Sequence, residues 1–124
     1  TVACDMRFSE DEGKLMSLAA YSYPSEIPEL DNIIRYDEKK KQLVSNTNIK
    51  FEYLLAENMK DNILWKYNRE AFAYAVQRHV ENQIIKIVKQ YMKETGIRNI
   101  AVSGGFFSNV ITTFITGQNI QTAR

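Results

Sequence analysis

The strongest constraint on this chain is one long amphipathic run at residues 68–96, which reads NREAFAYAVQRHVENQIIKIVKQYMKETG. Asn68 is a favourable N-cap residue, and Gly96 suits the position just past a helix C-terminus. Between them, apolar residues recur every three or four positions, as on one face of a helix. These residues are Phe72, Val76, Val80, Ile84, Ile87, Val88 and Tyr91. The pattern predicts a helix from about Asn68 to Thr95, about 40 Å long at ~1.5 Å per residue, with this stripe facing the core.

The residues after this helix predict a strand, a tight turn and a second helix. The run RNIAVS is apolar enough for a strand buried on both faces, centred on Ile100 to Ser103. Gly104 and Gly105 come next, and VITTFI then resumes a helical pattern. A helix, a strand and a helix joined by short connections are typical of a layered α/β fold.

The first half of the chain predicts shorter elements. A helix is expected from about Glu12 to Tyr21, and Ser25 could cap another short helix with Pro28 in its first turn. Alternating residues from Ile34 to Ser45 predict a hairpin. Its link, DEKKK, has no glycine, so the turn is either a longer one or contains a residue that such turns disfavour. A further short helix is expected from about Leu54.

Composition limits the classes of protein. The 124 residues hold 16 basic and 15 acidic side chains, for a net charge of +1, which argues against a nucleic-acid binder that relies on bulk charge. No apolar run reaches the ~18 residues of a membrane span. No signal peptide is visible. Cys4 is the only cysteine, so it forms neither an internal disulfide nor a cysteine zinc cluster. We expect a single cytoplasmic domain with no nucleic-acid or membrane partner.

Two interpretations of the Gly-Gly pair stay open on the residues alone. Glycines allow a strand to turn directly into a helix, and they also allow a phosphate to approach the backbone at a helix N-terminus. The spacing matches neither a Walker loop nor a dinucleotide fingerprint. Asn109 lies one helical turn further on, where its amide could face the same ligand or be exposed.

Three charged or titratable residues have simpler explanations. His79 is the only histidine, and one histidine without a second histidine or cysteine does not make an ordinary transition-metal site. Its place beside the apolar stripe predicts a packing or edge role. Glu81 lies away from the centre of that stripe and is expected to be solvated. Lys14, by itself, has the features of a surface lysine.

Four stretches in collinear order resemble one protein family. EGKLMSLAAYS resembles the segment KxMGLAxYG of the O-carbamoyltransferases of nodulation-factor and antibiotic biosynthesis. PELDNIIRYDEKKKQLVSNTNIKFEYLL resembles the stretch that follows there, a short hairpin leading to an aromatic segment. AFAYAVQRHVENQIIKIVKQYMKETGIRNIAVSGG is similar to AxxxQxxxExxxxxLxxxxxxxTGxxxLxLxGG, with Gln77, Glu81, Thr95 and Gly96 in place. GGFFSNVITT is similar to GGVFANVKLN. Ser17 and Ser22 replace two glycines of the first segment, and Thr113 replaces the last asparagine of the fourth.

This resemblance implies a fold and a reaction. The family belongs to the actin-like ATPase superfamily, whose members place two ribonuclease-H-like halves around a nucleotide. We therefore expect an α/β, helix-rich, partial ribonuclease-H-like lobe. In relatives that transfer a carbamoyl group, carbamoyl phosphate and ATP give a carbamoyl-adenylate, and the carbamoyl group passes to an acceptor hydroxyl. The resemblance places Gly104 and Gly105 against the nucleotide, flanked by Ser103 and Asn109, with Lys14 as a further nucleotide-binding residue.

The resemblance also implies that parts are missing. The family holds its divalent metal with histidines from a segment upstream of these residues, and this chain has His79 alone. The acidic, glycine-rich segment after the Gly-Gly motif and the C-terminal domain of the acceptor site are missing too. We therefore expect residues 1–124 to be one partial domain, an interior fragment of a carbamoyltransferase-type protein, without turnover on its own and completed by the remaining halves of its parent.

The sequence leaves two alternative functions open and predicts an oligomeric state. The chain could be a relative of the threonylcarbamoyl-transfer proteins that modify tRNA, or a non-enzymatic helical interaction domain in which the glycines only pack. A ribonuclease-H-like lobe has a central sheet of several strands, and the partners of the strand at Ile100 to Ser103 in that sheet are expected to lie outside these residues. Unpaired strand edges with an apolar face recruit other chains, so the isolated chain is expected to form a homodimer or a larger homo-oligomer.

Overall fold

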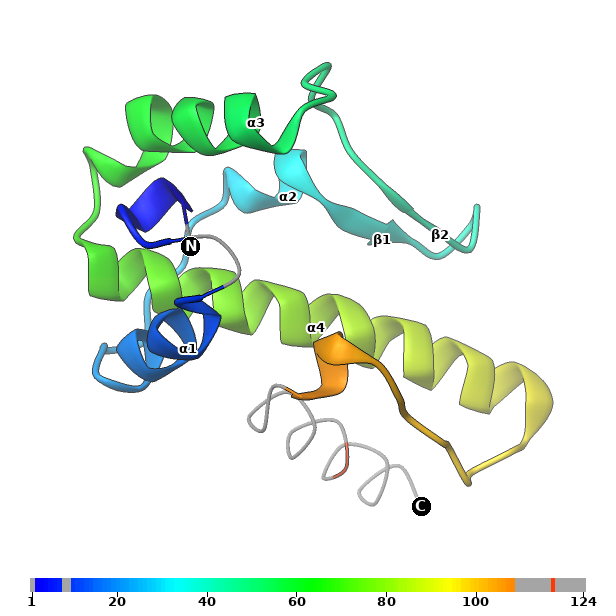
Figure 1. The fold of residues 1–124 in the computed structure, drawn as a ribbon. Helices are drawn as coiled ribbons and strands as arrows, with labels where there is room; N and C mark the ends of the chain where they lie inside the picture. Colours follow the sequence, from blue (N-terminus) through cyan, green and yellow to red (C-terminus); the bar gives the residue numbers. More distant parts are fainter. Residues whose placement is uncertain (1, 8–9, 109–116, 118–124) are drawn as a thin grey trace.

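The structure, a computed structural model, describes residues 2–7, 10–108 and 117. Within these residues, helices make up most of the regular structure, and one hairpin forms the sheet (Figure 1). In chain order the elements are the 3-10 helix η1 (Val2–Cys4), helices α1 (Glu12–Ala20) and α2 (Leu30–Ile33), strands β1 (Arg35–Asp37) and β2 (Gln42–Val44), helix α3 (Glu52–Met59), the π-helix η2 (Lys60–Leu64), helix α4 (Arg69–Thr95) and the 3-10 helix η3 (Gly105–Ser108).

The long helix begins and ends where the sequence predicts. The Asn68 side chain accepts a hydrogen bond from the backbone N–H of Ala71 at 2.7 Å, which satisfies one of the free donors of the first turn. Gly96 follows the last turn with a φ of 72°, in the left-handed region, and its N–H bonds to the carbonyl of Met92. The cap residues therefore set both ends of α4.

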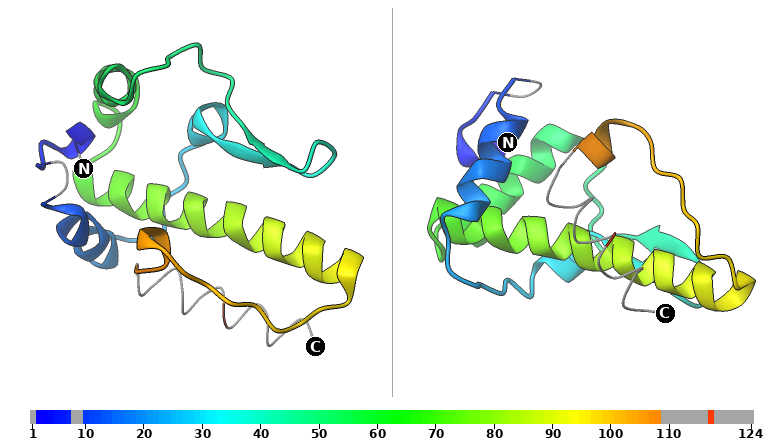
Figure 2. Two further views of the ribbon diagram at one scale, coloured as in Figure 1. Left: turned by 45° about the vertical axis from the view of Figure 1, so that its right-hand side comes forward. Right: turned by 90° about the horizontal axis from the view of Figure 1, so that it is seen from below.

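Helix α4 runs the length of the molecule, and the other elements gather around it. Helix α1 packs near its N-terminal end, while α3 and the hairpin lie along another side (Figures 1 and 2). Helix α1 confirms the helix predicted at Glu12. The short helix predicted near Pro28 exists as α2, but Ser25 does not cap it, because the Ser25 hydroxyl bonds to the Tyr23 carbonyl at 3.0 Å.

The predicted hairpin is also confirmed. Strands β1 and β2 are antiparallel, with Tyr36 opposite Leu43. The Asp37 carboxylate accepts the backbone N–H groups of Lys39 and Lys40, both at 3.0 Å, and so closes the turn. Lys41 then has a φ of 54°. The turn without glycine thus contains one residue in an unfavoured conformation, which is one of the two alternatives that the sequence left open.

The hydrophobic core lies at one end of α4. Its buried residues come from η1, α2, η2, the segment before α2 and the first turns of α4. They are Ala3, Cys4, Ile27, Leu30, Ile63, Phe72 and Ala75. Leu15 of α1 and Val76 of α4 pack against this cluster. Apolar burial therefore fixes the first half of the long helix.

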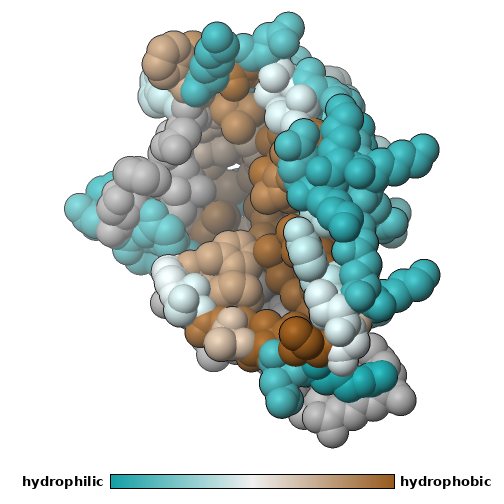
Figure 3. Space-filling view, turned by 90° about the vertical axis from the view of Figure 1, so that its right-hand side faces the viewer, coloured by the Kyte–Doolittle hydropathy of each residue, from teal (hydrophilic) through white to brown (hydrophobic). Residues whose placement is uncertain are grey.

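The predicted apolar stripe is wrong for the second half of α4. Only Phe72 is fully buried, whereas Ile84 and Val88 are half-buried and Tyr91 is 46% exposed. Periodicity identifies the apolar face, but burial also requires a covering layer, and the described residues provide an incomplete one here. Viewed toward the end of α4 and the hairpin tip, hydrophobic side chains line a hollow bordered by hydrophilic ones (Figure 3).

The buried strand predicted after α4 is wrong for this structure. Residues 97–104 form no regular element, and Ile100 and Val102 are 41% and 44% exposed. A strand needs the backbone of a neighbour, and no strand among the described residues lies beside this segment. The helix predicted at VITTFI falls outside the described residues. Within them, the glycine pair leads into η3.

Candidate functional site

The Gly-Gly pair forms a turn between an extended segment and η3. After Gly96 the chain turns back and runs alongside α4 toward the glycines (Figure 2). Gly104 has a φ of 89°, and its carbonyl accepts the N–H of Phe107 at 3.1 Å. Ser103, Gly104 and Gly105 are all exposed. The three residues that sequence analysis placed together at a phosphate are thus contiguous on the surface.

The two glycines have different reasons to be glycine. The positive φ of Gly104 is a conformation that other residues rarely adopt. Gly105 has no such φ, and a Cβ placed on either glycine would meet no described atom within 4 Å. Neither conformation nor packing within the described residues therefore requires a glycine at position 105. An open backbone is what a closely approaching ligand needs.

Lys14, the remaining described member of the predicted site, is engaged elsewhere. It lies on α1, and its Nζ atom is 2.7 Å from Oδ1 of Asp11, with the lysine side chain 67% exposed. The hydrogen bond from Lys14, followed by that from the backbone N–H of Arg7, lowers the pKa of Asp11. Asn109 lies outside the described residues.

Glu81 contradicts the prediction of a solvated charge. Its side chain is 1% exposed and accepts hydrogen bonds from Gln77 Nε2 at 2.7 Å and Arg78 Nη1 at 2.8 Å. Burial of a carboxylate is tolerable only when it is paired in this way. The partners stand four and three residues before it, so their spacing was a signal of a paired Glu81 that the periodicity of apolar residues did not reveal.

His79 confirms the prediction of an edge role. Its Nε2 atom lies 2.5 Å from the carbonyl oxygen of Ile34, directly before β1, and its Nδ1 atom lies 3.8 Å from the Asp31 carboxylate. The ring therefore bonds to a backbone carbonyl that pairs with no strand among the described residues. Among the described residues, no group of three or more histidine, cysteine or acidic side chains could hold a metal ion.

Two glutamines of α4 continue this contact along the hairpin. The Gln83 side chain is buried and accepts the backbone N–H of Tyr36 at 2.7 Å. Gln90 donates to the carbonyl of Glu38 at 3.1 Å. Together with His79, these side chains satisfy alternate backbone groups along the outer edge of β1, a role that sequence analysis did not foresee.

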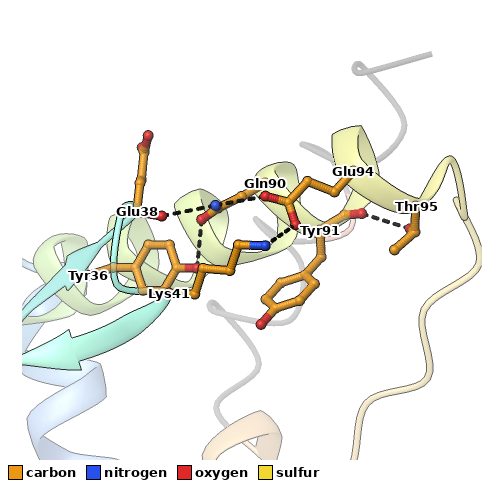
Figure 4. A network of polar contacts seen from close by, with 7 residues as sticks. All are labelled: Tyr36, Glu38, Lys41, Gln90, Tyr91, Glu94 and Thr95. Atoms are coloured by element: carbon orange, nitrogen blue, oxygen red, sulfur yellow. Dashed lines mark hydrogen bonds and ion pairs between the residues drawn. The ribbon is translucent and has the colours of Figure 1, made fainter.

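A polar network fixes the hairpin tip to the last turns of α4 (Figure 4). The Tyr36 hydroxyl donates to Gln90 at 2.6 Å, Gln90 donates to Glu94 at 3.0 Å, and Lys41 Nζ lies 2.7 Å from Glu94. Burial raises the pKa of Tyr36, the hydrogen bond from Lys41 lowers the pKa of Glu94, and Glu94 raises the pKa of Lys41. The network holds α4 at the point where the chain leaves for the glycine turn.

A comparison with known protein families finds a match that covers most of the chain. The family model described as the carbamoyltransferase N-terminus matches residues 4–116, from η1 through the glycine turn. The chain belongs to this carbamoyltransferase family. Among curated proteins it is similar to an uncharacterized protein of Methanocaldococcus jannaschii, with 28% identity over 110 residues, 83% of this chain. No solved structure matches it.

The chain spans only part of the length of this relative. The matched region is 17% of the length of the archaeal protein. All four stretches that suggested a carbamoyltransferase begin within the family match, and the glycine turn lies entirely inside it. In the part of the chain that the structure describes, no helix combines the length and apolarity needed to cross a membrane.

Proposed function

We propose that this chain is part of an O-carbamoyltransferase of the actin-like ATPase superfamily. Its parent would use ATP to activate carbamoyl phosphate and would pass the carbamoyl group to an acceptor hydroxyl. The family match supports the transfer of a carbamoyl group. The open glycine turn, which directly follows the long family segment, is the observation that supports a nucleotide at this place. In the proposed lobe, residues 100–103 would pair with strands of the parent.

The glycine turn fits a phosphate group. Its surface residues carry no bulk at positions 104 and 105. The first turn of η3 presents backbone N–H groups, which bind anions when they point outward from a turn. Ser103 adds a hydroxyl beside them. In this proposal Gly104 shapes the turn, Gly105 lets the phosphate reach the backbone, and Ser103 and Asn109 bind at its flanks.

The described residues do not fit the divalent metal of the proposed family. They contain no group of ligands that could hold one, and His79 is engaged with the backbone at Ile34. We therefore assign no step through a metal to this chain. Lys14 stays a predicted nucleotide-binding residue, and to serve as one it would have to leave Asp11.

The test is Gly105→Val in the full-length parent, with ATP binding measured by calorimetry. Position 105 has no positive φ, and a Cβ there would meet no described atom within 4 Å, so the variant should fold while its side chain occupies the space of the phosphate. We expect affinity to fall by about tenfold or more, the loss of roughly one charge-assisted hydrogen bond. Gly13→Val, at an equally open glycine of α1, is the matched control and should bind ATP normally. If Gly105→Val binds ATP with unchanged affinity, the nucleotide does not bind at this turn.

Two assays separate the alternatives that the sequence left open. ATP titration of the parent distinguishes an enzyme of this superfamily from a helical interaction domain, which would bind no nucleotide. Product analysis with carbamoyl phosphate and a hydroxyl acceptor then distinguishes carbamoyl transfer from threonylcarbamoyl transfer to tRNA. A parent that modifies tRNA but leaves a hydroxyl acceptor unmodified would replace the proposed activity with the second one.

A further inference from the structure

One face of α4 carries lysines for which the other described residues supply no ion pair. Lys86, Lys89 and Lys93 are three and four residues apart, so they lie on one face of the helix, and all three are exposed. We call these three residues the lysine stripe. Within the described residues, none of them forms an ion pair with a carboxylate.

The lysine stripe differs from some of the other lysines, although Lys39, Lys40 and Lys50 likewise form no ion pair among the described residues. Each of four other lysines lies within ion-pair distance of a carboxylate: Lys14 with Asp11, Lys41 with Glu94, Lys60 with Asp5 and Lys66 with Glu29. In the lysine stripe, by contrast, the positions one turn away from each lysine hold other lysines, amides or apolar residues. Like charges three or four residues apart destabilise a helix. The three lysines of the stripe therefore repel one another and lower the stability of the folded helix.

The helix dipole explains only part of this arrangement. Cations near a helix C-terminus are favourable, but the effect falls off within the last turn. Lys93 is in the last turn of α4, whereas Lys86 and Lys89 precede Thr95 by nine and six residues. The dipole therefore accounts for Lys93 but not for Lys86 and Lys89.

The surroundings of the lysine stripe are open. Lys86 and Lys89 line a groove of about 560 Å³ together with His79 and Asn82. Two carboxylates face this groove, and one of them, Asp31, lies beside His79; the other is Glu26. On the neighbouring side, Glu94 is taken by Lys41, while Glu38 makes no ion pair with the stripe among the described residues.

We propose that the lysine stripe docks an acidic helix of a partner protein, one with carboxylates at positions i, i+3 and i+7. The three lysines span seven residues, about 10 Å at ~1.5 Å per residue. Carboxylates at the same spacing on a second helix match this length and charge. This inference goes beyond the proposed activity and holds whether or not the glycine turn binds nucleotide.

An acidic helix fits the stripe better than nucleic acid does. Three phosphate contacts supply little affinity at physiological salt, and the chain as a whole carries a net charge of only +1. Residues 82, 86, 89 and 93, which form this face, include no aromatic side chain on which a base could stack. The face thus offers charge at helical spacing without the platform that single-stranded nucleic acids require.

The test uses a fluorescent helical peptide with glutamates at i, i+3 and i+7, and its glutamine version as a control, titrated with the 124-residue chain. We expect binding of the acidic peptide that weakens as salt rises, and none of the glutamine peptide. The variant Lys86→Glu, Lys89→Glu, Lys93→Glu should lower affinity by about tenfold or more. It should also gain affinity for a peptide with lysines at those three positions. A matched reversal at Lys39, Lys40 and Lys50 should change affinity less than about twofold.

A milder variant protects the test from misfolding. Lys86→Gln, Lys89→Gln, Lys93→Gln removes the repulsion within α4, so it should fold at least as well, by circular dichroism, and still lose the peptide. If the stripe reversal and the control reversal lower the peptide affinity equally, the binding depends on net charge alone, and the proposal is overturned. So would tighter binding of a short RNA duplex that the stripe variants abolish, because it would assign the lysines to nucleic acid.

Discussion

The two halves of α4 are held by different forces. The first half places Phe72, Ala73 and Ala75 in the buried interior, where apolar contacts from η1, α2 and η2 surround it. The second half is held by hydrogen bonds and an ion pair to the hairpin, through Gln90 and Glu94, while its apolar side chains stay partly exposed. Apolar burial contributes roughly in proportion to the area removed from water, whereas exposed ion pairs contribute little. The first half should therefore dominate stability, and the second half, together with the exposed segment 97–104 that follows it, should dominate association.

Association should give the largest measurable effect. Because Ile100 and Val102 are 41% and 44% exposed, we expect the isolated chain to sediment as a dimer or a larger assembly. Val102→Asp should shift it to the mass of a monomer, since a charge cannot be buried there without a partner. Tyr23→Asp, at a residue 87% exposed in the loop between α1 and α2, is the control and should assemble normally. A wild-type chain that is monomeric at every concentration contradicts the prediction.

Within the core half, Phe72→Ala should be the most destabilising substitution. Phe72 is 3% exposed, so its removal leaves a cavity, and the free energy of unfolding should fall by about 3–5 kcal/mol. Urea unfolding monitored by circular dichroism measures this change. A loss below about 1 kcal/mol would show that the first half of α4 is not packed as described.

In the other half, Ile84→Ala should cost less. A fully buried isoleucine would lose about 2–5 kcal/mol, but Ile84 is only half-buried, and we expect about 1 kcal/mol for the isolated monomer. The loss should grow with protein concentration if self-association covers this face. A loss as large as that of Phe72→Ala at low concentration would erase the distinction between the two halves.

The smallest effect belongs to the ion pair between Lys41 and Glu94. The lowered pKa of Glu94 contributes stability above its ordinary value of 4.5, and that contribution is lost as pH falls through the folded pKa. The raised pKa of Lys41 contributes below its ordinary value of 10.5 and is lost as pH rises through the folded pKa. Glu94→Gln should therefore lower the unfolding midpoint at neutral pH and match the wild type in acid. Glu38→Gln, at a carboxylate without an ion pair among the described residues, is the matched control and should leave the unfolding midpoint at neutral pH unchanged.

The difference between the halves also explains what could be predicted from the sequence. Asn68, Gly96 and the glycine-free turn at Lys41 act through their own backbone neighbours, so helix ends and hairpin were correctly predicted. The burial of Ile84 and the pairing of Ile100 depend on which surfaces cover them. The periodicity of one chain carries no information about a covering layer that lies elsewhere.

The same distinction applies to the candidate site. Gly104 needed its glycine for a local reason, and its positive φ agrees with the predicted turn. Whether Lys14 faces that turn is a question of long-range arrangement, and in this structure the lysine pairs with its neighbour Asp11. Glu81 was missed because its burial depends on two polar partners, Gln77 and Arg78, rather than on the apolar pattern.

The contacts of His79, Gln83 and Gln90 with the outer side of β1 make the two-stranded sheet able to grow in one direction only. A strand that joined β1 would have to displace all three side chains from the backbone of residues 34–38. On the opposite strand, Leu43 lies across from Tyr36, and the N–H and C=O groups of Leu43 point away from β1. Any strand that extends this sheet must therefore add beside β2. The sheet can extend from that edge only, and α4 stays at its closed boundary.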